Sequence, residues 1–213
     1  MASNRLLVEG VEDIHAIAQL MGHFVLWPRE DPPVRIVDCN GDELLQGARI
    51  STEIKTYDAV GVVLDADQNL AGRWNTVRNQ ATSIFTVPAQ LPAEGLILSN
   101  QEGRRFGVWI MPDNQQHGML ETFLKLLVPV QRAALWEYAE AATVEARNRG
   151  ALFSTAHTDK AKMHTWLAWM EPPGQSLGHA IRARILDPSA VHAQNFVSWF
   201  IGLYGLERKA AQR

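Results

Sequence analysis

The sequence predicts an α/β fold built on a mainly parallel sheet. Three short apolar runs in the first half of the chain are each followed by a helical pattern. Two further apolar runs then flank a short polar loop, and only helical patterns follow. Repeated βα units cross over in a right-handed sense and place helices on the faces of a parallel sheet. We therefore expect a mainly parallel sheet flanked by helices, with an antiparallel hairpin element and an all-helical C-terminal region.

Continuous apolar runs predict the strands of the first half, because strands covered on both faces lack polar alternation. Such runs occupy residues 6–9 and 60–64, and a further strand is expected at 34–39. Apolar residues at helical spacing, among them Ile14, Ile17 and Met21, predict the first helix. The expected helices of this half cover residues 12–25, 43–56 and 70–84.

The second half begins with a predicted hairpin. Two apolar runs, 95–99 and 105–111, flank the loop Asn100-Gln101-Glu102-Gly103-Arg104, a polar connection typical of paired antiparallel strands. A helix opening near Gly118 is expected to end at Pro129. Further helices are expected at 130–148, 159–170, 178–185 and 190–204. We divide the chain into a catalytic α/β domain, 1–127, and a helical C-terminal extension, 128–213, packed on it as one compact unit.

Composition limits the possible classes of protein. The 213 residues are 46% hydrophobic and 20% charged, as expected of a globular protein with a sizeable core. The net charge of −3 provides no global basic field for nucleic acid, so any such contact needs local basic patches or a partner. The single cysteine, Cys39, fits a reducing compartment and is expected to be a small buried apolar residue. With no signal peptide and no apolar run of membrane-spanning length, we expect a cytoplasmic protein without membrane contact.

Carboxylates follow two of the predicted strands. Glu9 ends the first strand, and Asp65 and Asp67 follow the third. Neighbouring parallel strands deliver their carboxyl ends to one edge of a sheet, where ligands bind. Helix capping is the competing explanation for the two aspartates, but it does not explain Glu9. Converging carboxylates repel one another unless a cation lies between them, and oxygen-only ligands suit Mg²⁺ or Mn²⁺.

These segments resemble a known family. Leu7-Val8-Glu9-Gly10-x-x-Asp13 and Val63-Leu64-Asp65-Ala66-Asp67 resemble the Toprim domain of topoisomerases, bacterial primases, recombination-repair proteins and OLD-type nucleases. The resemblance covers about residues 4–125, and it is closest to the OLD-nuclease branch with its small stand-alone members. It implies a Toprim-like sheet and a metal site at Glu9, Asp13, Asp65 and Asp67.

The same resemblance extends to later residues. Glu121 in Met119-Leu120-Glu121 matches a further acidic residue of that branch, and Lys160 and Lys162 are the candidates for its downstream lysine. The implied activity is hydrolysis of nucleic-acid phosphodiester bonds, with DNA favoured over RNA. The implied cofactors are two Mg²⁺ or Mn²⁺ ions, and OLD-type systems add an ATPase as a possible partner.

Our hypothesis for the mechanism divides the acidic residues between two ions. Asp65 and Asp67 hold one ion, while Glu9 and Glu121 hold the other, and Asp13 is a ligand or supports one. Two such ions can clamp the attacking and leaving oxygens of a phosphodiester. A lysine, Lys160 or Lys162, neutralises charge near the scissile phosphate. Arg73 and Arg78 are candidates for contacts with the nucleic-acid backbone.

Two other functions remain open. One is a catalytically silent Toprim scaffold, or a regulatory partner of an ATPase, which the missing basic field favours. The other is a phosphatase in which Asp65 is the nucleophile, although that mechanism leaves Glu9 unexplained. His157 and His164 lack a histidine or cysteine partner at zinc-ligand spacing, so we expect structural or surface roles for them. The oligomeric state stays open.

Overall fold

A computed structural model, which describes residues 4–210, contains one five-stranded sheet with the strand order β2-β1-β3-β5-β4. Strands β1, β2, β3 and β5 are parallel, and β4 pairs antiparallel with β5. The α/β class, the mainly parallel sheet and the antiparallel element are therefore confirmed. The strands are β1 Asn4–Val8, β2 Arg35–Asp38, β3 Ala59–Asp65, β4 Leu96–Ser99 and β5 Arg105–Met111.

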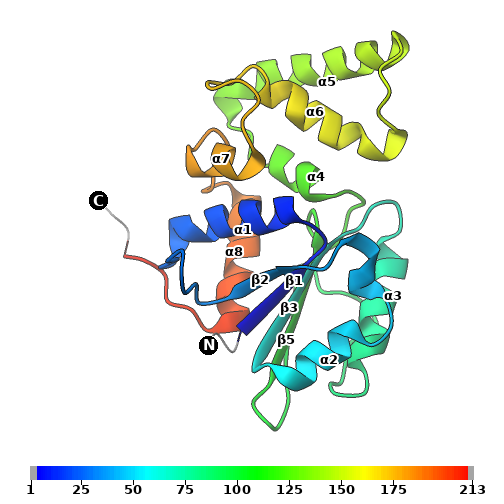
Figure 1. Cartoon of the computed structure of the whole chain (residues 1–213), viewed down its shortest axis with the longest axis vertical. Helices are drawn as coiled ribbons and strands as arrows, with labels where there is room; N and C mark the ends of the chain where they lie inside the picture. Colours follow the sequence, from blue (N-terminus) through cyan, green and yellow to red (C-terminus); the bar gives the residue numbers. More distant parts are fainter. Residues whose placement is uncertain (1–3, 211–213) are drawn as a thin grey trace.

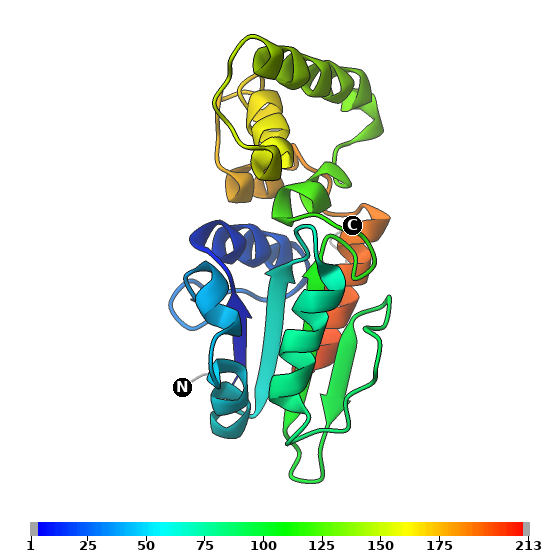
Figure 2. The same ribbon diagram turned by 90° about the vertical axis from the view of Figure 1, so that its right-hand side faces the viewer.

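Helices form layers on both faces of this sheet. Helices α1 and α8 cover one face, and α2 and α3 cover the other (Figure 1). Helices α4 to α7, which we call the helical cap, lie beyond the carboxyl ends of the strands (Figures 1 and 2). The helices are α1 Val11–Phe24, α2 Arg49–Thr56, α3 Leu70–Ala81, α4 Leu120–Lys125, α5 Ala133–Asn148, α6 Thr158–Leu167, α7 Leu177–Arg182 and α8 Val191–Tyr204.

The central strands β1, β3 and β5 are buried on both faces, whereas the edge strands β2 and β4 contain exposed residues. Successive strand residues alternate between two cores. Leu6 and Val8 belong to the core under α1 and α8, whereas Leu7 belongs to the core under α2 and α3. The first core also takes in side chains of the helical cap, among them Trp136 and Trp166. The apolar content of the C-terminal region is thus used to cover the sheet and to build the cap.

One predicted helix is wrong in extent. The sequence pattern suggested a single helix over residues 43–56, but the structure has a 3₁₀ turn at Gly41–Leu45 and then α2 from Arg49. Gly47 lies between them with a φ of +57°, a left-handed conformation that glycine adopts at little cost and that ends a helix. Other predicted elements differ at their ends by a few residues, as in α3, which ends at Ala81.

Helix α8 packs closely against the sheet at Gly61 in β3. A β-carbon added there would contact the hydroxyl of Tyr204 and lie 2.7 Å from Leu6 Cδ1 and 3.0 Å from Leu203 Cδ2. The Tyr204 hydroxyl also donates a 2.6 Å hydrogen bond to the Arg5 carbonyl oxygen. Only glycine allows the C-terminal helix to pack this close to the central strand.

Replacing this glycine is expected to destabilise the fold. Gly61→Ala should lower the free energy of unfolding by about 1–3 kcal/mol, because the added methyl group overpacks a closed core. Gly22→Ala in α1 is the matched control, since its added carbon meets its nearest neighbour, Trp27 Cβ, at 4.0 Å. The control should be neutral or gain up to about 1 kcal/mol from helix propensity. Urea denaturation of both variants measures this, and equal stabilities would contradict the packing argument.

Among the described residues, no helix is both long and apolar enough to cross a membrane.

Candidate metal centre

The carboxyl ends of β1 and β3 border a topological switch point. From β1 the chain moves outward to β2, whereas from β3 it moves to the other side of the sheet, toward β5 and β4. The helices that follow β1 and β3 therefore lie on opposite faces, which opens a crevice between the strand ends. Glu9 directly follows β1, and Asp65 is the last residue of β3. The predicted convergence of these two carboxylates is present, and the charge of Glu9 acts on Asp65.

Backbone contacts of the Asp65–Asp67 turn position α4. The Leu120 N–H, at the start of α4, donates a 2.9 Å hydrogen bond to Asp65 Oδ1. Asp67 and Gly118 exchange two backbone hydrogen bonds of 2.8 and 3.0 Å. These bonds hold the first turn of α4 against the end of β3, and so they bring Glu121 to the same crevice.

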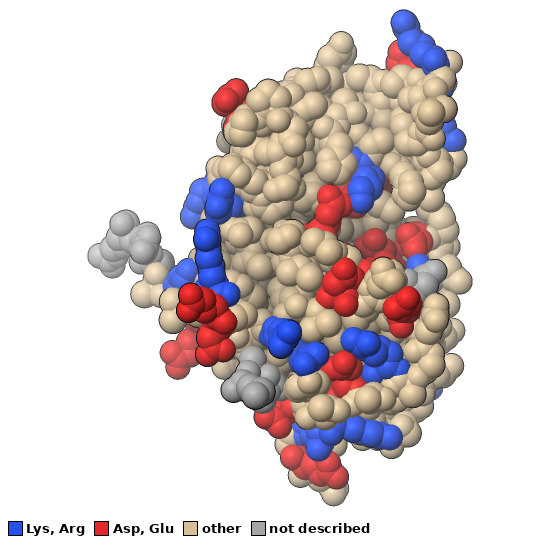
Figure 3. Space-filling model, viewed as in Figure 1, with Lys and Arg blue, Asp and Glu red and all other residues tan. Residues whose placement is uncertain are grey.

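The crevice contains a hollow of about 310 Å³ with an acidic lining. Figure 3 shows acidic side chains gathered between the helical cap and the sheet. Of the predicted site residues, Asp67 lies outside the lining of this hollow and lines an adjoining groove of about 970 Å³. The predicted residues that line the hollow are Glu9, Asp13, Asp65, Glu121 and Lys160.

Burial and mutual repulsion raise the pKa of three of these carboxyl groups. Burial raises the pKa of Asp65 well above its usual value, and the charges of Asp13, Glu9 and Glu121 add to the rise. Burial raises the pKa of Asp13 to about 7, although a hydrogen bond from the Gly10 N–H opposes the rise. Burial also raises the pKa of Glu121, and the charge of Lys160 offsets part of that rise. A divalent cation reverses this balance, because it favours the ionised form of every carboxylate around it.

Two basic side chains flank the acidic residues. Arg73 Nη2 donates a 2.5 Å hydrogen bond to Asp67 Oδ2, and Arg73 Nη1 lies 3.9 Å from Glu9 Oε1. On the other side, Lys160 Nζ donates a 2.7 Å hydrogen bond to Glu12 Oε2 and lies 3.6 Å from Glu121 Oε1. The site therefore has an arginine half, where Arg73 lies near Asp67 and Glu9, and a lysine half, where Lys160 lies near Glu12 and Glu121. Asp65, at the end of β3, and Asp13, in α1, complete the acidic set.

The structure separates the two lysine candidates. Lys160 lines the hollow, whereas Lys162 Nζ lies 3.4 Å from Glu140 Oε1 and 3.5 Å from Asp159 Oδ1, within the helical cap. Lys162 is therefore placed to join helices rather than to meet a ligand in the hollow. Arg78, predicted to contact nucleic acid, donates a 3.1 Å hydrogen bond from its Nε to the Pro88 carbonyl oxygen and lines neither the hollow nor the groove.

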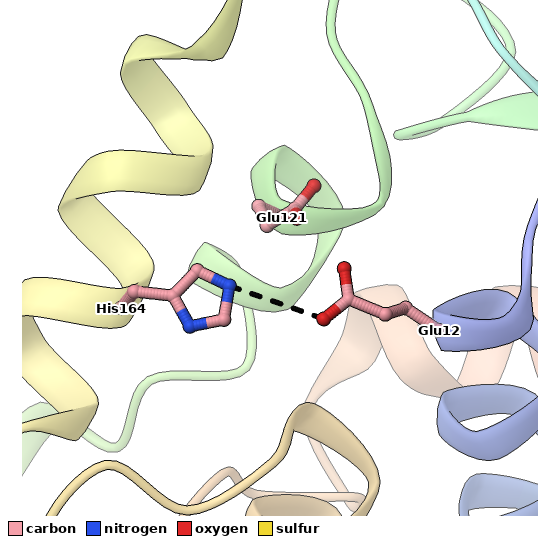
Figure 4. Close-up of side chains that lie close together, drawn as sticks. All are labelled: Glu12, Glu121 and His164. Carbon is pink, nitrogen blue, oxygen red and sulfur yellow. Dashed lines mark ion pairs between the residues drawn. The ribbon is translucent and has the colours of Figure 1, made fainter. Parts of the chain in front are cut away.

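Two residues that the sequence did not single out as ligands join the lysine half. Glu12 of α1 and His164 of α6 point toward each other, and Glu121 of α4 lies beside them (Figure 4). One donor atom from each of these three residues lies within 4.8 Å of the other two. The available sequence signal was weak: His164 follows Lys160 by four residues, so both project from one face of a helix.

A family model described as a protein of unknown function, DUF3226, matches residues 3–205. The chain belongs to the DUF3226 family. The match includes the sheet, the helical cap and α8, so the DUF3226 unit contains every element that contributes a side chain to the hollow. No curated protein and no solved structure matches the chain.

Proposed function

We propose that this DUF3226 protein is a metal-dependent phosphodiesterase that cleaves nucleic acid and uses a Toprim-like arrangement of carboxylates. The observation that carries the proposal is the convergence of Glu9, Asp13, Asp65 and Glu121 on one hollow at the switch point of the sheet. These side chains come from the end of β1, from α1, from the end of β3 and from α4. N-capping of a single helix does not require acidic residues from four separate segments.

The donor set fits Mg²⁺ or Mn²⁺. Carboxylate oxygens are the ligands that these hard cations prefer. Crowding carboxylates in a buried place costs free energy, as the raised pKa of Asp65 and of Asp13 indicates, and bound cations remove that cost. Glu9, Asp13, Asp65 and Glu121 are the residues that would hold the ions. Divalent ions there supply positive charge to the attacking and leaving oxygens of a phosphodiester.

The chain's own side chains serve the reaction in two ways. Lys160 is the basic side chain in the hollow, and its ammonium group is suited to neutralising an oxygen of the scissile phosphate. The adjoining groove of about 970 Å³ starts at Asp67 and Arg73 and runs between the first turn of α3 and the segment before α6. This groove offers room for a nucleic-acid strand next to the carboxylates.

The acidic surface of the chain affects which substrate it can take alone. A net charge of −3 gives little general attraction to a phosphate backbone, so we propose DNA delivered by a partner, with a separate ATPase as the candidate. Arg73 is the described basic residue shared by the groove and the carboxylates. To contact a nucleic-acid phosphate, Arg73 would have to break its hydrogen bond with Asp67.

A cleavage assay tests the proposal. Purified protein is incubated with supercoiled plasmid, single-stranded DNA and structured RNA, with Mg²⁺, with Mn²⁺ and with a chelator. We expect metal-dependent cleavage of at least one substrate, and we expect Asp65→Ala,Asp67→Ala to reduce the rate at least a hundredfold. Lys162→Met is the matched control, because it changes a charged residue of the cap that does not line the hollow. Cleavage that persists in the double variant would overturn the proposal.

One observation favours the second candidate, a catalytically silent scaffold or regulatory partner of an ATPase. The Arg73 guanidinium lies between Asp67 and Glu9, where it neutralises part of the acidic site without a metal ion. This candidate predicts that the protein binds Mg²⁺ or Mn²⁺, or a partner, while none of the three substrates is cleaved.

A further inference from the structure

We infer that Glu12, Glu121 and His164 form a second, adjoining site for a transition-metal ion of the Zn²⁺ or Co²⁺ type. The three residues come from α1, α4 and α6, so the site joins the α/β layer to the helical cap (Figure 4). It lies in the lysine half of the acidic cluster and shares Glu121 with the carboxylates described above. This inference does not require that the protein cleaves nucleic acid.

The geometry is close to that of an assembled three-ligand site. Donor atoms of the three residues lie within 4.8 Å of one another. An ion that is bound tetrahedrally at about 2.1 Å by each donor requires donor separations of about 3.4 Å. Rotation of exposed side chains can supply the remaining closure of up to about 1.4 Å, since the side chains of His164 and Glu12 are 44% and 46% exposed. Glu121 is the fixed ligand, because its side chain is only 5% exposed.

The nitrogen donor sets the metal preference. A site with one imidazole and two carboxylates suits Zn²⁺, Co²⁺ and similar ions, whereas Mg²⁺ prefers oxygen ligands alone. The all-carboxylate set around Asp65 and the histidine-containing set around Glu121 therefore differ in the ion that they select. Three protein ligands leave further positions on the ion open to water or to a substrate oxygen.

The ammonium group of Lys160 competes with a metal ion for the carboxylates of Glu12 and Glu121. Its ammonium group donates a hydrogen bond to Glu12 but stays 3.6 Å from Glu121 Oε1, beyond the usual length of a charge-assisted hydrogen bond. The buried carboxylate of Glu121 thus has a cation near it that is held mainly by another residue. The Lys160 side chain is 44% exposed, so it can swing toward solvent when an ion enters.

Titration with Co²⁺ tests this site, because the visible absorption of bound Co²⁺ reports its ligands. The folded protein is first saturated with Mg²⁺ to fill the all-carboxylate set. Wild type should then bind one further equivalent of Co²⁺, and His164→Gln and Glu12→Gln should each weaken this binding at least tenfold. His157→Gln is the matched control: it replaces an exposed histidine just before the same helix and should bind Co²⁺ as wild type does.

Lys160→Met should change Co²⁺ affinity in the opposite direction to His164→Gln and Glu12→Gln. Removing the competing ammonium group should tighten Co²⁺ binding severalfold, although the same change should slow any nucleic-acid cleavage. The inference is overturned if His164→Gln binds Co²⁺ with wild-type affinity and spectrum, or if Lys160→Met weakens binding. Asp65→Asn separates the two proposals: it should lose Mg²⁺-dependent cleavage but keep the Co²⁺ spectrum that depends on His164.

Discussion

Asp65→Asn is expected to make the metal-free protein more stable and to abolish its stabilisation by Mg²⁺ and Mn²⁺. Burial and four neighbouring carboxylates raise the pKa of Asp65, so ionising it in the fold costs free energy. Asparagine keeps the size of the side chain and an oxygen for the hydrogen bond from the Leu120 N–H. At pH 8 without metal we therefore expect Asp65→Asn to have a higher Tm than wild type.

Adding metal should reverse the order of the two proteins. Mg²⁺ or Mn²⁺ at a hundred times its Kd should stabilise wild type by about 2.7 kcal/mol, whereas Asp65→Asn should gain little. Thermal unfolding with Mg²⁺, Mn²⁺ or a chelator measures both effects. Asp58→Asn is the matched control, because Asp58 is an exposed aspartate just before the amino end of the same strand. A variant that is stabilised by Mg²⁺ as much as wild type would remove Asp65 from the metal site.

The second large effect is a pH dependence that arises at Asp13. Its pKa is raised from 3.8 to about 7 in the fold, chiefly by burial. Well below pH 3.8, the pKa of the unfolded chain, this carboxyl group is protonated in both the folded and the unfolded chain, so it costs nothing. As the pH rises toward 7, the unfolded chain loses this proton while the folded chain keeps it, and stability falls. Above pH 7 the penalty is complete, at about 4 kcal/mol.

Comparing Asp13→Asn with wild type isolates this penalty. The variant keeps an oxygen that can accept the hydrogen bond from the Gly10 N–H but has no charge. The difference in unfolding free energy should be near zero well below pH 3.8, grow from there up to about pH 7 and then stay constant. Saturating Mg²⁺ should shrink it, since the ion favours ionised Asp13 in wild type. Chemical denaturation across this pH range measures the difference, and a flat difference would contradict the raised pKa.

The sheet and the principal carboxylates could be predicted because they depend on local patterns and on topology. Continuous apolar runs mark the buried strands, and parallel strands place residues such as Glu9 and Asp65 at one edge. The break at Gly47 was missed because a single glycine within a helical pattern does not reveal its φ. The patterns around it fit one long helix equally well.

The sequence did not predict which basic and acidic side chains contact one another in the site. Lys160 and Lys162 lie two residues apart on one helix, so they point about 200° apart and only one can face the hollow. Which one does so depends on how α6 docks against α4. The inward position of Arg73 and the approach of Glu12 and His164 depend on the same docking of the helical cap. These contacts join residues far apart in the chain, and no periodicity or motif spacing in the sequence predicts them.

Cleavage by wild type and by Asp65→Asn, measured under single-turnover conditions on one nucleic-acid substrate, tests the central claim most directly. The variant should be at least as stable as wild type without metal, so a lost activity is not a lost fold. We predict cleavage by wild type that requires Mg²⁺ or Mn²⁺ and stops with a chelator, and a rate at least a hundredfold lower for Asp65→Asn. Equal rates for the two proteins, or wild-type cleavage that continues in the chelator, would contradict a nuclease built on these carboxylates.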